Sequence, residues 1–162
     1  MMAQDQKTTC FFVAGIPVPK GSAKAFLRPG AKIPTVMQDN AEKQKPWSSS
    51  IGYAAQQAGV TMAPKGQPVK IDLIFYFPRP KGHYGTGKNA ETLKASAPAN
   101  HVTKPDLDKL VRCVLDALTG IAWNDDAQVQ GVFATKWYGD APGVEVEIEA
   151  CEWAIKPNKT GE

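Results

Sequence analysis

The segment from Val69 to Phe77 most constrains the fold of this chain. Every second residue in it is apolar, and Ile74 and Tyr76 give the opposite side apolar character as well. Such alternation predicts a β-strand, and apolar residues on both sides favour a central strand with a helix over it. The rest of the chain must therefore supply strands on both edges and a covering helix.

The segment from Pro105 to Thr119 predicts the principal helix. Its apolar residues recur at i, i+3 and i+4 and cover an arc of about 140° on a helical wheel. Pro105 suits a first helical turn, and Gly120 is a natural C-terminal stop. One face of this helix is therefore built to pack against the sheet.

Shorter patterns predict the remaining elements. They are a strand around Phe11–Val13, a basic hairpin from Lys24 to Gln38, a helix from near Asn40 or Pro46 to Gln57, and antiparallel strands over 129–138 and 144–153. We expect an α+β fold in two layers, a small mixed sheet with two main helices. Residues 1–155 form a single domain in this interpretation, and residues 156–162 form a flexible tail.

Composition indicates a soluble protein of the cytosol. The chain has 162 residues, of which 43% are hydrophobic and 22% charged, which is ordinary for a globular domain. No stretch approaches the roughly 18 apolar residues of a membrane span, and we expect no signal peptide. Three cysteines without a CxxC pair argue against a disulfide framework and a zinc knuckle.

Residues 78–104 predict a mobile basic loop, because they are rich in Gly, Pro, Lys, Ala and Ser and show no periodicity. Between Pro78 and Pro105 there are five basic residues and one acidic residue. This surplus of four positive charges exceeds the surplus of three in the whole chain. The pattern suggests a polyanionic partner, and the alternative is a solvated loop without a ligand.

Four carboxylates flank the principal helix. Asp106 and Asp108 lie at its start, and Asp125 and Asp126 follow its end. Carboxylates with water are the ligands that Mg²⁺ prefers, often with a substrate phosphate. The alternative is structural, because Asp at a helix start is favoured by capping and by the helix dipole. A helix of this length is about 22 Å long, so the sequence alone does not bring the two pairs together.

Arg112 lies one helical turn after Asp108 and one turn before Asp116. This stripe is either a surface salt-bridge ladder or a placement of the Arg112 guanidinium toward a bound phosphate. His83 and His101 have no second ligand at metal-binding spacing, so we expect them to be solvated or to contact phosphate.

The sequence resembles the RusA family of Holliday junction resolvases. The residues that carry the resemblance are Lys104-Pro105-Asp106-Leu107-Asp108-Lys109-Leu110, then Asp116-Ala117-Leu118, then Trp123-Asn124-Asp125-Asp126-Ala127-Gln128-Val129. They keep the order and spacing of the family pattern DLDxL, DAL and DDxQV. A Pro-x-Pro-Lys-Gly segment at 17–21 fits more loosely.

The resemblance implies a Mg²⁺ site on Asp106, Asp108 and Asp126, in which Mn²⁺ substitutes, with Asp125 in a supporting position. A family lysine falls on Arg112, which keeps the positive charge but cannot give up a proton. The family acts as homodimers that nick opposing strands of four-way DNA junctions, and many members are encoded by phages. The residues expected to contact DNA are Lys20, Lys24, Arg28, Lys81, Lys88, Lys104 and Lys109.

Three rival functions stay open at this point. A metal-dependent phosphatase of the DxD type is disfavoured, because its aspartate normally ends an apolar strand and Asp106 does not. A non-catalytic junction-binding protein is the second rival. The third is a related nuclease that acts mainly on forks or flaps.

Overall fold

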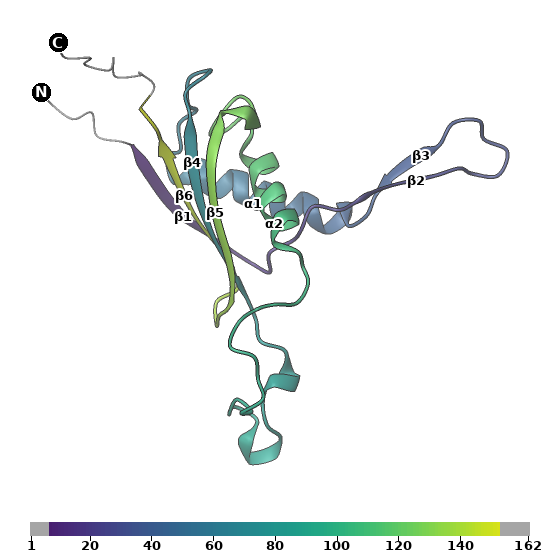
Figure 1. Cartoon of the computed structure of the whole chain (residues 1–162), viewed down its shortest axis with the longest axis vertical. Helices are drawn as coiled ribbons and strands as arrows, with labels where there is room; N and C mark the ends of the chain where they lie inside the picture. Colours follow the sequence, from purple (N-terminus) through teal and green to yellow (C-terminus); the bar gives the residue numbers. More distant parts are fainter. Residues whose placement is uncertain (1–6, 153–162) are drawn as a thin grey trace, which may run out of the picture.

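A computed structural model of the chain describes residues 7–152. It shows a four-stranded mixed sheet, two helices on one face of the sheet, and a hairpin that projects away from both (Figure 1). The predicted α+β class is confirmed. The strands are β1 (Thr8–Ala14), β2 (Ala23–Phe26), β3 (Thr35–Gln38), β4 (Val69–Phe77), β5 (Val129–Tyr138) and β6 (Gly143–Ala150), and the helices are α1 (Ala41–Gln57) and α2 (Leu107–Leu118).

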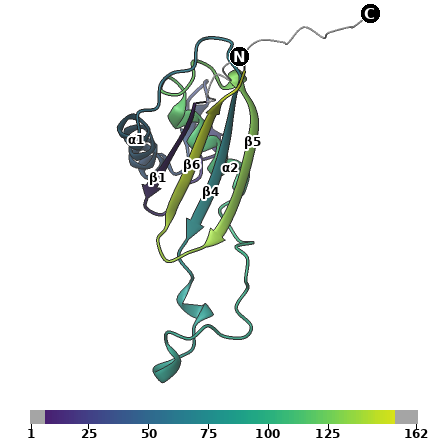
Figure 2. The same ribbon diagram turned by 90° about the vertical axis from the view of Figure 1, so that its left-hand side faces the viewer.

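The sheet has the strand order β1-β6-β4-β5, which Figure 2 shows from the face that no helix covers. β4 pairs with β6 in the antiparallel sense and with β5 in the parallel sense, so the predicted central strand is confirmed. Ile71, Leu73 and Phe75 on β4 are fully buried. The parallel pair requires a crossover connection, and α2 lies within that connection.

The predicted antiparallel pairing of the last two strands is wrong. β5 and β6 run in opposite directions, but β4 lies between them. Residues 139–142 pass around the end of β4, where the Gly139 N–H donates to the Phe77 carbonyl at 2.9 Å. Both edges of β4 carry main-chain groups that need partners, and β5 and β6 each satisfy one edge. Trp153, which the prediction placed in the last strand, lies outside the described residues.

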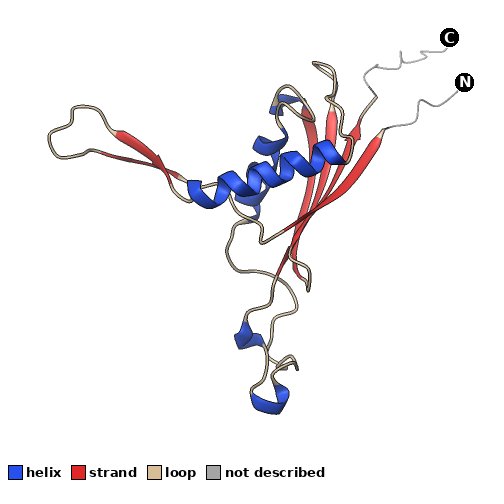
Figure 3. Ribbon diagram, turned by 180° about the vertical axis from the view of Figure 1, so that it is seen from behind, coloured by secondary structure: helices blue, strands red, loops and turns tan. Residues whose placement is uncertain are grey.

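Both helices pack against the same face of the sheet, as Figure 3 shows from behind. α2 buries Leu110, Cys113, Val114 and Leu118 completely. α1 begins at Ala41, so the first of its two expected starts is correct. Pro46 lies within α1 and is exposed, where it removes one main-chain hydrogen bond of the helix. Within residues 7–152, no helix is long and apolar enough to cross a membrane.

The hairpin of β2 and β3 confirms the predicted basic hairpin. We call residues 22–39 the arm. Ala23 pairs with Gln38 and Phe26 with Thr35. The arm extends from the start of α1 into solvent (Figure 1).

Residues 78–104, the basic segment, form a second projection beyond the end of β4 (Figure 1). It contains two 3-10 turns, Lys81–His83 and Gly87–Asn89. At its base, the His101 ring lies 4.6 Å from the Phe77 ring and 4.8 Å from the Tyr138 ring. His101 is only 7% exposed, so the expectation of a solvated His101 is wrong. The aromatic neighbours that bury it come from two strands, which local sequence does not reveal.

Candidate functional site

The start of α2 presents two aspartates without using either as a side-chain cap. Asp106 occupies the N-cap position, but its side chain makes no capping hydrogen bond. Its main-chain carbonyl instead accepts from the Leu110 N–H at 3.2 Å. The Lys136 ammonium on β5 donates to the Thr103 and Pro105 carbonyls, at 2.5 and 2.8 Å. Lys136 therefore ties the chain that leads into Asp106 to the sheet.

The turn after α2 places Asp126 beside the end of that helix. Gly120 has a φ of 85°, and its N–H donates to the Trp123 carbonyl at 2.7 Å. This tight reversal seats Trp123 in the core with no exposed area. The chain then runs back beside the helix, which the sequence alone did not establish.

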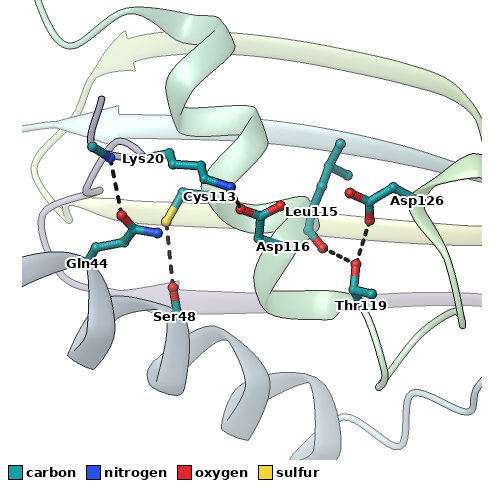
Figure 4. A network of polar contacts seen from close by, with 9 residues as sticks. Lys20, Gln44, Ser48, Cys113, Leu115, Asp116, Thr119 and Asp126 are labelled. Carbon is teal, nitrogen blue, oxygen red and sulfur yellow. Dashed lines mark hydrogen bonds and ion pairs between the residues drawn. The ribbon is translucent and has the colours of Figure 1, made fainter. Parts of the chain in front are cut away.

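Two neighbours hold one oxygen of Asp126. Oδ1 accepts from the Thr119 hydroxyl and, at 3.1 Å, from the Trp123 indole N–H (Figure 4 shows the Thr119 contact). The Asp126 carboxylate thus keeps a defined orientation, and within residues 7–152 both of these hydrogen bonds go to Oδ1 rather than Oδ2. The sequence does not predict that Thr119 and Trp123 contact Asp126, although both lie within seven residues of it.

Asp125 supports the turn that carries Asp126. Its side chain accepts from the Ala127 N–H at 2.8 Å. In return, the Gln128 side-chain oxygen accepts from the Asp125 N–H at 3.3 Å. This reciprocal capping box stabilises the short turn, so the Asp125 carboxylate already has a structural task.

Asp108, Arg112 and Asp126 line one open groove of about 520 Å³ between α2 and β5. The remaining lining residues are apolar: Leu107, Val111, Leu115, Val132 and Ala134. Asp108 and Thr119 are about 16 Å apart along the helix axis, at 1.5 Å per residue. Asp126 is hydrogen-bonded to Thr119, so the two carboxylates lie toward different ends of the groove.

Asp106 faces a neighbouring pocket of about 500 Å³. Its Oδ2 lies 3.5 Å from the Lys109 ammonium. Lys43, Lys104 and Lys109 line this pocket together with Asp106, which makes it cationic. Lys43 is not among the predicted DNA contacts. It is an exposed lysine of α1, and no local sequence pattern indicates that it lies beside Asp106.

The structure does not bring Asp106, Asp108 and Asp126 together as one set of metal ligands, because Asp106 lines one pocket and the other two line the groove. Within residues 7–152, no three His, Cys, Asp or Glu side chains are grouped so that they could hold a metal by themselves. Mg²⁺ commonly takes one or two carboxylates and completes its shell with water and substrate phosphate. The three aspartates are of the chemical type that Mg²⁺ prefers, and any ion they bind would need water or substrate phosphate to complete its shell.

Arg112 is not part of a salt-bridge ladder on α2. Among the described residues it takes part in no ion pair, and Asp116 pairs with Lys20 instead (Figure 4). The Arg112 guanidinium is exposed on the groove. The arrangement therefore leaves its charge available for an anion.

The predicted DNA-contacting residues lie in four places. Lys24 and Arg28 are on the arm, Lys81 and Lys88 are on the basic segment, and Lys104 and Lys109 line the pocket beside Asp106. Lys20 is at the root of the arm, where its ammonium is paired with Asp116. That pairing makes Lys20 an anchor between the arm and α2.

The match to known proteins covers both ends of α2. The model of the family described as Endodeoxyribonuclease RusA matches residues 17–149 of the chain. The chain belongs to the RusA family. It is also 33% identical over 138 residues to a protein of Bacillus subtilis (strain 168) named "Uncharacterized protein YqaN", and the match covers 85% of this chain and 93% of that relative. The resemblance seen in the sequence is confirmed, and RusA membership supports an endodeoxyribonuclease activity.

Proposed function

We propose that this protein is a Mg²⁺-dependent endodeoxyribonuclease that resolves four-way DNA junctions by paired, symmetric nicks. The observation that carries the proposal is the groove that Asp108, Arg112 and Asp126 line together in a chain of the RusA family. Two carboxylates and one guanidinium beside an open surface suit a phosphodiester, which needs both a metal and a counter-charge.

The acidic side chains and the basic Arg112 have different roles in this proposal. Asp106 and Asp108 at the start of α2, and Asp126 beyond its end, would supply carboxylate ligands to Mg²⁺ bound together with the substrate, with Mn²⁺ as a substitute. When bound, the ion would polarise the phosphate and lower the pKa of a bound water. Arg112 stabilises the negative charge that develops on the phosphate, since an arginine stays protonated at working pH. Thr119 and Trp123 keep Asp126 oriented through its Oδ1.

The cations of the arm, the basic segment and the pocket beside Asp106 bind the DNA backbone in this proposal. Binding through phosphate contacts releases counterions, so affinity should fall steeply with salt. We also propose that the active species is a homodimer, because a two-fold protein matches a two-fold junction and accounts for paired nicks with identical sites.

The test compares nicking of a four-way junction, a fork, a flap and a linear duplex of the same sequence in Mg²⁺. We expect the junction to be nicked fastest and at symmetric positions. Asp108→Asn should lower the nicking rate by about 10³-fold while leaving junction binding in place. The proposal is wrong if Asp108→Asn nicks junctions at the parental rate.

The same substrates separate the remaining alternatives. Preferential nicking of the fork or the flap would make the protein a related nuclease with another main substrate. Tight junction binding without cleavage in either Mg²⁺ or Mn²⁺ would indicate a non-catalytic junction-binding protein.

A further inference from the structure

The arm exposes apolar side chains that no other part of the described chain covers. Every residue from 22 to 30 is exposed. In the connection between β2 and β3, Leu27 is 62% exposed and Ile33 is 78% exposed. An isolated two-stranded hairpin is marginally stable in water, and apolar side chains at its tip add nothing to the fold. Their position indicates a partner.

The charges on the arm are positive toward the tip. Arg28 and Lys32 lie in the same connection as Leu27 and Ile33. The Arg28 guanidinium lies 5.9 Å from the centre of the Phe26 ring and is in no ion pair among the described residues. The one acidic residue of the arm, Asp39 at its root, pairs with Lys24 at 3.3 Å. The tip thus combines apolar side chains with free cations.

The root of the arm is attached to the helix that carries the candidate site. The Lys20 N–H donates to the Lys109 carbonyl at 2.9 Å, and its ammonium pairs with Asp116 (Figure 4). The Gly21 N–H donates to the Gln44 side chain at 3.2 Å. A Cβ on Gly21 would lie 1.5 Å from the Asp39 carbonyl oxygen, so only glycine lets the two ends of the arm meet this closely. The arm is therefore held in a set direction relative to α2.

We propose that the arm recognises the branch point of DNA. Leu27 and Ile33 would contact base faces that are unstacked where strands diverge, and Arg28 and Lys32 would contact the adjacent phosphates. Apolar side chains inserted at base steps are a known way to bind deformed DNA, and the cost is lowest where stacking is already broken. From Ser22 to Gly30 an extended chain spans about 25 Å, which lets the tip act at a distance from the groove.

The charge of the arm favours DNA over a second copy of the chain. Two arms side by side would bring like charges together. The exposed Glu145 and Glu147 lie on the uncovered face of the sheet, and the arm of the same chain leaves the molecule on the other side, where the helices lie (Figure 3). This inference rests on the proposed function and assigns the arm the selection of branched over linear DNA.

The test measures DNA binding without cleavage, in Ca²⁺, by the full chain and by the double variant Leu27→Ser, Ile33→Ser. The probes are a four-way junction with 2-aminopurine at the branch point and a linear duplex of equal length. The matched control is Val36→Ser, which removes a side chain that is 65% exposed on β3 of the same arm.

We expect the double variant to bind the junction about 10-fold more weakly, as for the loss of base-stacking contacts, and to lose the fluorescence change at the branch point. Its affinity for the duplex should stay within two-fold, and Val36→Ser should match the parent. Equal junction affinity and fluorescence in parent and double variant would overturn the inference, while junction nicking by the parent would still support the nuclease. Light scattering decides the alternative: conversion of a parental dimer to a monomer in the double variant would assign the tip to a second copy instead.

Discussion

The body of the molecule, meaning the sheet with α1 and α2, differs in packing and charge from its two projections, the arm and the basic segment. In the body, α2 packs Leu110, Val114 and Leu118 against the sheet with no exposed area and carries the aspartates on its outer side and at its ends. The arm and the basic segment bury few side chains and carry much of the free positive charge. Catalytic groups need fixed positions, which packed helices and strands provide. Contacts to a long polyanion such as DNA instead need side chains that extend away from the body. Mutations in the body should therefore change nicking or stability, whereas mutations in the projections should change DNA binding.

The largest expected effect is on the reaction itself. Asp108→Asn keeps the size of the side chain but removes a metal-binding charge, and we expect nicking of a four-way junction to fall by about 10³-fold. The control is Asp72→Asn, an exposed carboxylate on β4 whose side chain faces away from α2. Single-turnover nicking rates in Mg²⁺ check both variants, and an equal loss in Asp72→Asn would refute the assignment of the reaction to the α2 side.

The next largest effect is on stability, where a substitution in the core should differ from one on the arm. Leu110→Ala removes a fully buried side chain, so we expect the free energy of unfolding to fall by about 2–5 kcal/mol. Leu27→Ala at the exposed tip of the arm should change it by less than about 0.5 kcal/mol. Urea denaturation measures both. Similar losses at the two sites would show that the arm belongs to the cooperative core.

A smaller effect tests how Asp126 is held. Thr119→Val keeps the shape of the side chain but removes the hydroxyl that donates to Asp126 Oδ1. Loss of an orienting partner of a metal ligand typically costs 10–100-fold, so we expect nicking to slow about 10-fold and the half-saturating Mg²⁺ concentration to rise. Thr135→Val on β5 is the control. Unchanged Mg²⁺ dependence in Thr119→Val would contradict a role for Asp126 at the metal.

Charges on the arm should affect how strongly the DNA affinity depends on salt concentration. Replacing both Arg28 and Lys32 by Ala removes two phosphate contacts in our proposal. The slope of log K against log salt concentration should then become shallower by about 2. Lys70→Ala on the uncovered face of the sheet should leave the slope unchanged. Binding titrations at several salt concentrations provide the measurement, and a parental slope in the double variant would remove the arm from the DNA contact surface.

The smallest effect lies where the basic segment joins the body. Burial, and then the nearby Lys136 charge, lowers the pKa of His101 below its usual value near 6.5. Near pH 6.5 the unfolded chain therefore binds a proton at His101 more readily than the folded protein does. The free energy of unfolding should accordingly fall as the pH drops below 6.5. In His101→Asn this pH-dependent loss should be smaller. Urea denaturation at pH 7.5, 6.5 and 5.5 gives the comparison, and parallel pH profiles would contradict it.

Periodicity predicted the elements but not all of their neighbours. The range Val69–Phe77 is the observed β4, and 129–138 is the observed β5, because alternation reports which residues of a strand face a core. The same alternation does not say which strand lies on each edge. The sequence therefore predicts that 129–138 pairs with 144–153, whereas in the structure β4 lies between β5 and β6.

The sequence alone determined the family, the central strand, the amphipathic α2 and the carboxylates at both ends of that helix. These features depend on residue type and spacing, which local chemistry controls. Only the tertiary structure decided that Asp126 is held by Thr119 and Trp123, that Asp116 is paired with Lys20, and that Asp106 and Asp108 face different pockets. Those outcomes depend on how the turn after α2 and the root of the arm pack against one helix, and such contacts join residues that are distant in the chain.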